Sequence, residues 1–223
     1  MMYRCVAFLL LAISVSTGAG CGRVPRIIVL EDPLSADEHV ALGVAYERKG
    51  ELGPAAREYE RALRKDAKSF RARLNLGNVR LAEKRYAEAR GEYLAALALR
   101  PGDAETTNNL AWAAILAGEA LEDALSRLSA ALSSRDARSP RPSDGLTPSL
   151  LDTQGVLLAR LGRAVEAEAA FARAESACLA AGNPPAGAPP GTAPACPEAV
   201  LREIRAHRAQ LRIPLSSPLG KPL

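Results

Sequence analysis

Apolar and small residues along this chain follow the spacing of one helix face, and that pattern itself repeats. Residues 42–63 show helical spacing on both sides of a glycine-containing break. Five positions then recur at one constant offset: Leu42, Gly43, Ala55, Tyr59 and Ala62 return as Leu76, Gly77, Ala89, Tyr93 and Ala96. The chain is therefore predicted to contain an internal repeat of two helices joined by a turn.

Two further stretches carry the pattern less regularly. Leu110 and Ala111 keep the same offset from Leu76 and Gly77, but the second-helix positions of this unit fall one position later, so its turn has gained one residue. Gly155 and Phe171 mark a fourth unit. Between these two units, residues 133–148 contain several prolines and no apolar periodicity, which predicts a loop longer than the usual turn between repeats.

The glycines inside the predicted first helices need an explanation, because glycine within a helix costs roughly 1 kcal/mol relative to alanine. Close packing is the explanation that the pattern favours. We expect Gly43 of the first helix to face Ala55 of the second, so that the two backbones approach. Leu42, Tyr46 and Tyr59 would then fill the space around this contact.

The repeating unit resembles the tetratricopeptide repeat, whose pattern is W-x2-L-G-x2-Y, then A-x3-F, then proline, within a unit of about 34 residues. Residues 42–46 supply Leu-Gly-x2-Tyr, residues 55–59 supply Ala-x3-Tyr, and Pro101 falls where the second unit should close. His39 and Arg73 stand at the tryptophan position, which is a common departure from the pattern.

This resemblance implies an all-α fold, namely a right-handed α-solenoid of about four helix-turn-helix hairpins with a C-terminal capping helix. The repeat domain would span residues 36–181, with units at about 36–69, 70–103, 104–134 and 148–181. Such units cannot bury their apolar faces alone, so at least three must stack and the ends must be covered.

The segment after the repeats is predicted to supply that cover. Residues 197–213 form an amphipathic helix whose apolar stripe lies opposite an arginine-rich face and consists of Val200, Ile204, His207 and Leu211. Contact of this basic helix with an anionic membrane is the alternative. Residues 182–196 are rich in proline and glycine and are predicted to be a linker, and residues 214–223 a flexible tail.

The first twenty residues have the pattern of a secretory signal peptide: a basic residue, a short apolar stretch, then small residues. Gly18 to Cys21 partly resembles the box before the lipid-modified cysteine of bacterial lipoproteins, which prefers leucine where Gly18 stands. This resemblance implies an acylated Cys21 that tethers the chain to a membrane of the bacterial envelope, with residues 21–35 as a linker. The alternatives are ordinary cleavage nearby, giving a secreted protein with a free Cys21, and an uncleaved anchoring helix.

Either route leads to an oxidising compartment, where Cys178 and Cys196 form an even set. A bridge between them would tie the last segment to the preceding helix and contribute about 3 kcal/mol. The alternative is a pair of unbonded, small hydrophobic residues. Their spacing does not fit a C-x-x-C redox or zinc motif.

Composition and charge exclude several functional classes. The chain has 223 residues, of which 48% are hydrophobic, and a formal net charge of +4. Acidic and basic residues are interspersed along residues 47–92, so no basic stripe forms that could follow a nucleic acid backbone. A single helical domain with extensions, and without a nucleic acid partner, is the resulting expectation.

Residues suited to catalysis are few. The only histidines, His39 and His207, lie at opposite ends of the predicted array and are expected to serve packing or surface roles. Asp152 is expected near the start of a first helix, where a carboxylate favours the helix dipole. Glu166 and Glu168 are expected on a solvated helix face. We therefore predict neither an enzyme nor a metal or cofactor site.

The resemblance implies a concave groove, lined by the first helix of each unit, that binds a peptide or protein segment. The family's groove positions correspond here to Val40, Val44, Glu47, Leu74, Asn78, Leu81, Asn108, Trp112, Ile115, Asp152, Val156 and Arg160. Asn78 and Asn108 would either bond an extended peptide backbone or have an exposed structural role. Trp112 would be either an aromatic contact for the partner or a space-filling residue against the next unit.

Relatives that clamp the carboxyl terminus of chaperones use cations across three first helices. The matching positions here are Val40, Val44, Asn75, Glu105 and Asn109, which include no cation. The sequence thus predicts a non-catalytic scaffold at the bacterial envelope, in the periplasm or at the outer membrane. The alternatives are a spacer or assembly factor that self-associates and an accessory subunit of an envelope enzyme.

Overall fold

The computed structural model describes residues 32–138, 146–182 and 196–211. The chain divides into two compact units, Met1–Pro33 and Leu34–Leu223. Of the first unit only Asp32 and Pro33 are described, and neither has regular secondary structure. The predicted signal peptide, Cys21, most of the predicted linkers and the C-terminal tail lie outside the described residues.

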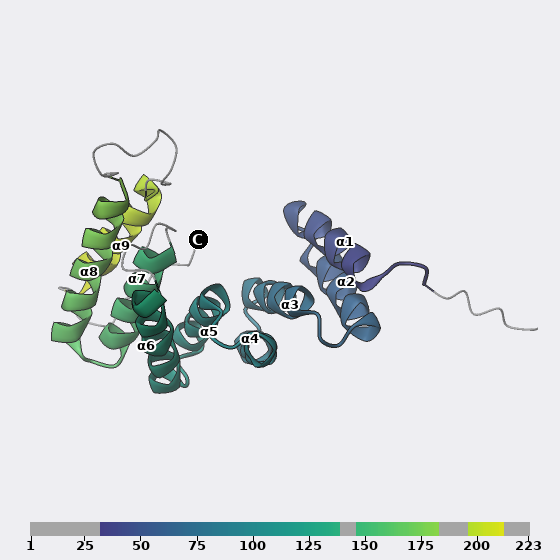
Figure 1. Ribbon diagram of the computed structural model, residues 1–223, viewed down its shortest axis with the longest axis horizontal. Coiled ribbons are helices and arrows are strands. Elements are labelled where there is room, and N and C mark those ends of the chain that lie inside the picture. The colour runs from purple at the N-terminus through teal and green to yellow at the C-terminus, as the bar shows by residue number, and fades with distance from the viewer. Residues whose placement is uncertain (1–31, 139–145, 183–195, 212–223) are drawn as a thin grey trace, which may run out of the picture. The chain divides into compact units, whose positions relative to one another are not determined.

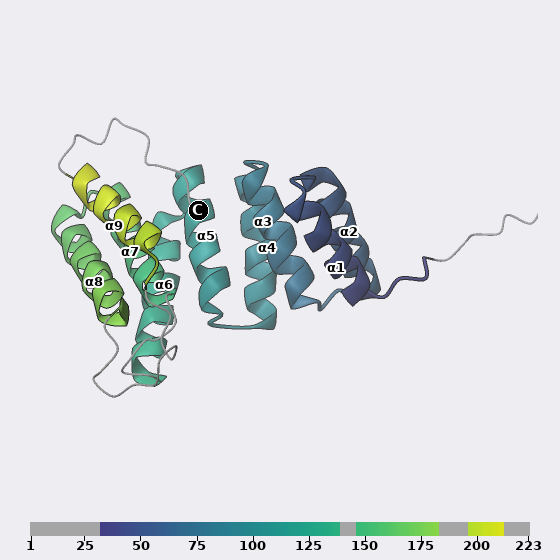
Figure 2. The same ribbon diagram turned by 90° about the horizontal axis from the view of Figure 1, so that it is seen from above.

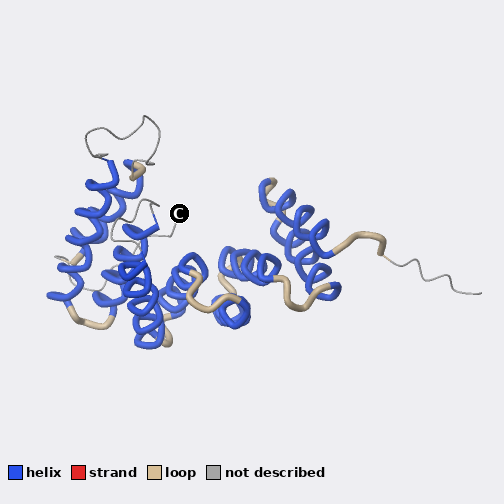
Figure 3. Tube along the Cα trace, in the orientation of Figure 1, coloured by secondary structure: helices blue, strands red, loops and turns tan. Residues whose placement is uncertain are grey.

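The described residues form helices and contain no strand, which confirms the all-α prediction (Figures 1 and 3). In chain order the helices are α1 (Ala36–Arg48), α2 (Leu52–Lys65), α3 (Phe70–Ala82), α4 (Tyr86–Leu99), α5 (Ala104–Ala117), α6 (Leu121–Arg138), α7 (Leu146–Arg160), α8 (Ala164–Gly182) and α9 (Glu198–Gln210).

The first eight helices pair as hairpins, α1 with α2 through α7 with α8, and the hairpins follow one another in chain order (Figure 2). Each first helix contacts the next first helix, and each second helix contacts the first helix that follows it. Among the described residues, no second helix contacts the next second helix. The first helices therefore lie closer together than the second helices do, and they form the inner face of the stack.

Polar caps begin the first three first helices, and they follow one another at the repeat spacing. Ser35 and Ser69 accept hydrogen bonds from the amides of Glu38 and Ala72, at 3.3 and 3.4 Å. Asp103 accepts one from the Thr106 amide at 2.9 Å. At Ser35 the Glu38 carboxylate bonds back to the Ser35 amide, which completes a capping box.

The turns inside the hairpins share one backbone conformation. Gly50, Lys84 and Gly118 follow each other at the repeat spacing and have φ values of 76°, 61° and 71°, and Gly162 has 76° in the fourth hairpin. This left-handed conformation is strained for a residue with a Cβ atom. Lys84 is therefore the costly member of the set.

The hydrophobic core consists of three clusters arranged along the chain. Val40 and Tyr59 belong to a cluster built from α1, α2 and the start of the next hairpin. Tyr93 belongs to a second cluster that reaches from α3 to α5. The third cluster includes Trp112 and Phe171 and runs from α5 to α9. Each cluster involves hairpins that are neighbours in sequence, as expected for a repeat stack.

The predicted loop at residues 133–148 is too long. Helix α6 continues to Arg138 and α7 begins at Leu146, so only residues 139–145 lie between them. The hydroxyls of Ser133 and Ser134 donate to carbonyls of the preceding turn, at 3.0 Å each, and so these polar residues do not end the helix.

Candidate binding face

The two helices of a hairpin meet where a glycine lies against an aromatic ring. A Cβ atom added to Gly43 would lie 2.5 Å from Cε1 of Tyr59. The same distance separates such an atom on Gly77 from Tyr93. Gly43 thus faces the Tyr59 ring, and its contact with Ala55 stays a prediction. The glycine leaves room for a flat ring that crosses from the second helix, and a methyl group there would collide with it.

The tyrosine hydroxyls meet polar side chains of the first helices. Tyr59 donates to the Glu47 carboxylate at 2.6 Å, and Tyr93 donates to Oδ1 of Asn78 at 2.8 Å. Asn109 donates to the same Asn78 oxygen at 3.0 Å, which links α3 with α5. Burial raises the pKa of the Tyr93 hydroxyl, and the charges of Glu47 and Glu105 raise it further. Two carboxylates of the inner face therefore act on one buried hydroxyl.

Several residues that were predicted to line the groove are buried in the structure. Val40, Ile115 and Val156 are buried, with at most 1% of their surface exposed. Their side chains fill the core clusters between hairpins, and so they cannot contact a partner. Leu74, Trp112 and Asp152 are also buried, which corrects their placement in an open groove. The predicted positions that remain accessible are Val44, Glu47, Asn78, Leu81, Asn108 and Arg160.

Asp152 and His207 form a buried pair that joins α7 to α9. His207 Nδ1 lies 2.8 Å from Asp152 Oδ2, and the two side chains are 4% and 8% exposed. Burial works against protonation of His207, but the hydrogen bond and charge of Asp152, with the charge of Glu203, raise its pKa. Asp152 lies six residues after the first residue of α7, so its expected place near the helix start is wrong.

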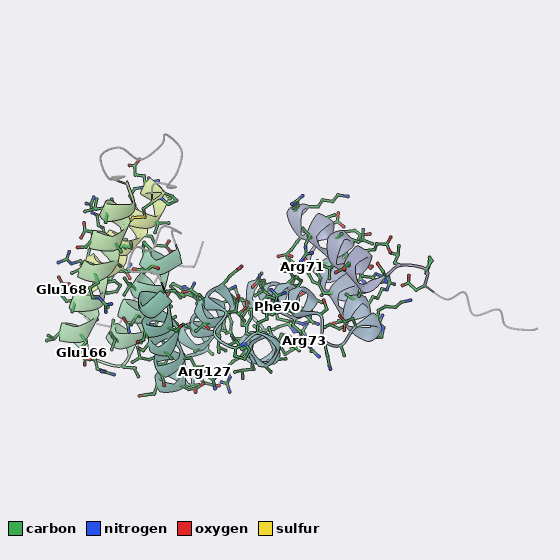
Figure 4. All side chains as sticks on the ribbon, viewed as in Figure 1. Phe70, Arg71, Arg73, Arg127, Glu166 and Glu168 are labelled. Atoms are coloured by element: carbon green, nitrogen blue, oxygen red, sulfur yellow. A yellow bond between two sulfur atoms is a disulfide. The ribbon has the colours of Figure 1, made fainter. Side chains whose placement is uncertain are left out.

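Ion pairs and a disulfide also hold α9 against α8. Arg205 bonds Glu175 at 2.7 Å, and Arg208 bonds both Glu168 and Glu175, all on α8. Figure 4 marks Glu168 on that helix. Cys178 at the end of α8 is bonded to Cys196 just before α9, with a Cα–Cα distance of 5.1 Å. Helix α9 contacts α7 and α8 as α7 contacts α5 and α6, and so it takes the position of a fifth first helix.

The two histidines have structural partners. His39 Nδ1 lies 2.7 Å from Glu58 Oε2, and Arg61 donates to the other oxygen of this carboxylate at 2.7 Å. The His39–Glu58 and His207–Asp152 pairs were not predicted. The sequence carries a signal for both pairs, because each histidine lies on the face of its helix that packs into the hydrophobic core.

A pocket opens on the inner face where α5, α7 and α9 meet. Its volume is about 230 Å³, and it is lined by Asn108, Asn109, Trp112, Ser149, Asp152, Thr153, Val200 and Glu203. We call it the inner pocket. Thr153 Oγ1 lies 2.7 Å from Oδ1 of Asn108 and 2.9 Å from the Ser149 carbonyl oxygen, and its single hydrogen is shared between these two acceptors. Asn108 and Asn109 are half-buried and thus available to a ligand.

A larger depression of about 530 Å³ lies between α6, α7 and α8, on the side of the second helices. Arg163 and Glu166 in its lining bond each other at 2.7 Å. Figure 4 labels Glu166 of this lining, and the exposed Arg127 of α6, also labelled there, donates to Asp123 at 2.9 Å. Because these charges are exposed and largely paired, this depression resembles an ordinary solvated surface.

Two further features are absent from the described residues. Within the described ranges, no group of three or more histidine, cysteine or acidic side chains is placed to hold a metal ion. No helix among the described residues has the length and apolar character needed to cross a membrane.

Stacked helical hairpins, with first helices on a shared inner face and a further helix covering the end, define a helical-repeat solenoid. Residues 40–104 match the family model described as Tetratricopeptide repeat. Residues 40–104 thus contain tetratricopeptide repeats. No curated protein sequence matches the chain significantly.

Solved structures share this fold. PilW, described as a widely conserved type IV pilus biogenesis factor, has a TM-score of 0.54 at 24% identity, over 64% of this chain and 61% of that one. The chain thus spans less than two thirds of PilW. YrrB, a TPR protein with an unusual peptide-binding site, has a TM-score of 0.54 at 20% identity, over 79% of this chain and 86% of that one. Pseudomonas aeruginosa pilF has a TM-score of 0.52 at 24% identity, over 81% of this chain and 74% of that one.

Proposed function

We propose that the protein is a non-catalytic scaffold that holds a segment of another protein against its inner face, at the inner pocket. The observation that carries this proposal is the pocket itself, in which three consecutive first-position helices bring amides, hydroxyls and carboxylates together. Stacked repeats use such faces to bind other molecules. The peptide-binding site named for YrrB supports the same reading of this fold.

The inner pocket offers hydrogen bonds suited to an extended backbone. The Oδ1 atom of Asn108 is occupied by Thr153, which leaves its amide hydrogens for a ligand. The Nδ2 atom of Asn109 is occupied by Asn78, which leaves its carbonyl oxygen. The pair thus presents one donor and one acceptor, the two hydrogen-bonding functions of a peptide group.

Photocrosslinking tests the proposal. A photoreactive amino acid at Asn109 should give a discrete crosslinked product in cells, with an attached protein that mass spectrometry identifies. The matched control has the same amino acid at Leu94, which is 36% exposed on the second helix α4 and does not line the pocket. Equal adducts at both positions, or none at Asn109, would contradict binding at the inner face. An adduct of the chain with itself would favour a self-associating spacer.

We also propose that the protein works at the bacterial cell envelope, tethered through a lipid on Cys21. The signal-peptide pattern of residues 1–20 and the partial lipoprotein box support this location. The pilus biogenesis role named for PilW, a protein of similar fold, is compatible with it. Metabolic labelling with a fatty acid precursor should mark the wild type and leave Cys21→Ser unlabelled. Labelling of neither protein would refute the tether without affecting the proposed binding face.

A further inference from the structure

The inner pocket contains a carboxylate oxygen that lacks a partner. Oδ2 of Asp152 is bound to His207, whereas Oδ1 has no hydrogen-bond partner among the described residues. The Asp152 side chain is only 8% exposed and lines the pocket. A buried carboxylate oxygen without a donor is costly, because the loss of hydration is not compensated. A ligand that brings a donor to this oxygen would remove that cost.

A second carboxylate lies on the other side of the pocket. Glu203 comes from α9 and lines the pocket together with Asp152 of α7. Burial raises the pKa of Glu203, and although the His207 charge opposes this rise, the charge of Asp152 adds to it. The described lining residues include neither lysine nor arginine. The pocket is therefore acidic, and the cationic group that adjoins it, His207, is already bonded to Asp152.

The acidic character continues along the inner face. Glu47 of α1 and Glu105 of α5 both act electrostatically on the Tyr93 hydroxyl, so both carboxylates lie within electrostatic range of it. With Asp152 and Glu203, carboxylates thus come from α1, α5, α7 and α9. Arg71 of α3, which acts on Tyr59, and the exposed Arg160 of α7 are exceptions. The four carboxylates named here therefore outnumber these two guanidinium groups.

We propose that the inner pocket takes the lysine or arginine side chain of the protein segment that the inner face holds. The aliphatic stem of that side chain would lie along Val200, and its charged head would donate to Asp152 Oδ1 and to Glu203. The hydroxyls of the lining offer further acceptors. This inference rests on the proposed binding of a protein segment and names the residue type that the segment must present.

A metal ion is the weaker occupant. Two carboxylates from two helices provide only part of a coordination shell, and no group of three or more ligating side chains exists within the described residues. Neutral amides and hydroxyls beside two carboxylates suit the several N–H donors of an ammonium or guanidinium group.

Selection from a random peptide library with the purified full chain tests the inference. The selected peptides should share a lysine or arginine. Replacing that residue by norleucine, which has a similar stem without the charge, should weaken binding about tenfold or more. Glu203→Gln should weaken binding of the original peptide to a similar extent. In this variant, the norleucine replacement should no longer change the affinity of the peptide.

Glu198→Gln is the matched control, because Glu198 is on the same helix, is exposed and does not line the pocket. It makes the same change of charge and should leave peptide affinity within about twofold of wild type. Circular dichroism spectra of both variants should match the wild type. Glu203→Gln is preferred to a change at Asp152, whose loss would also disturb the contact with His207.

The outcomes separate this inference from the proposed function. Peptides that are selected without a shared basic residue, but that compete with crosslinking at Asn109, would overturn the basic-side-chain assignment and keep the binding face. The same holds if Glu203→Gln and Glu198→Gln bind equally well. Failure to select any peptide, together with absence of an adduct at Asn109, would overturn the binding face itself.

Discussion

The ring of Tyr93 lies so close to Gly77 that a Cβ atom at residue 77 would be 2.5 Å from ring atom Cε1. Tyr93 is fully buried and its hydroxyl is bonded to Asn78, so the ring cannot move aside. We therefore expect Gly77→Ala to lower the free energy of unfolding by about 1–3 kcal/mol, although alanine is the better helix former. Urea unfolding followed by circular dichroism measures this change.

Two further variants test whether the collision with Tyr93 causes this loss of stability. Gly91→Ala makes the same substitution in α4 of the same hairpin, where an added Cβ meets nothing within 4 Å, and it should stabilise the protein by up to about 1 kcal/mol. Adding Tyr93→Leu to Gly77→Ala should restore part of the lost stability, because the third hairpin buries Ala111 and Leu128 at the corresponding positions. Destabilisation of equal size by both alanine variants would refute the collision.

The turn of the second hairpin contains a lysine where the other hairpins have glycine. Lys84 has φ 61°, a conformation that costs a side-chain-bearing residue about 1 kcal/mol or more. We expect Lys84→Gly to raise the unfolding free energy by roughly 0.5–1 kcal/mol, the remainder being lost to the greater freedom of the unfolded chain. Thermal unfolding of Lys84→Gly and Lys84→Ala distinguishes the backbone effect from loss of charge. An equal gain from alanine would exclude the backbone explanation.

The repeat register could be predicted from the sequence because it depends on local chemistry repeated at one spacing. The caps Ser35, Ser69 and Asp103 stand at the same constant offset as the core positions of the repeat. Side-chain direction could not be predicted in the same way. Gly43 and Ala55 are both small and both buried, and only the three-dimensional contact shows that the glycine faces Tyr59.

The candidate site was predicted in part. The first helices and the residues Asn108, Trp112 and Asp152 do line the inner pocket. The open position predicted for Asp152 is wrong, because Asp152 is buried against His207 of α9, which comes 55 residues later in chain order. The burial of Trp112 favours the space-filling alternative for that residue. A single polar residue at a core position, such as His207, is an ambiguous signal until its partner on another helix is known.

The bond between Cys178 and Cys196 closes a loop with a sequence separation of 18. In the chain-entropy model a loop of this size contributes about 3 kcal/mol. A reducing agent should therefore lower the melting temperature of the wild type. It should have no effect on Cys196→Ser, which should melt near the temperature of the reduced wild type. Equal melting temperatures of oxidised and reduced wild type would show that the ion pairs of Arg205 and Arg208 hold α9 without the disulfide.

The buried pair of His207 and Asp152 should make stability depend on pH. The pKa of His207 in the folded protein is above its ordinary value of 6.5. A histidine with a raised folded pKa stabilises the fold fully below the unfolded value, and this contribution is lost as pH rises through the folded pKa. The wild type should therefore lose stability from pH 6 into the mildly alkaline range relative to His207→Gln, which cannot titrate.

Unfolding free energies of both proteins in urea at a series of pH values measure this difference. His207→Gln keeps a side-chain donor for Asp152, so its fold should persist with a loss of about 1–3 kcal/mol at pH 6. The difference between wild type and variant should shrink as pH rises, since neutral His207 offers Asp152 a hydrogen bond without the charge. Glu203 also has a raised pKa, and because the His207 charge acts on it, both proteins are compared in a Glu203→Gln background. A difference that stays constant between pH 6 and pH 9 would show that His207 contributes by packing against Trp112 and Phe171 and not by its charge.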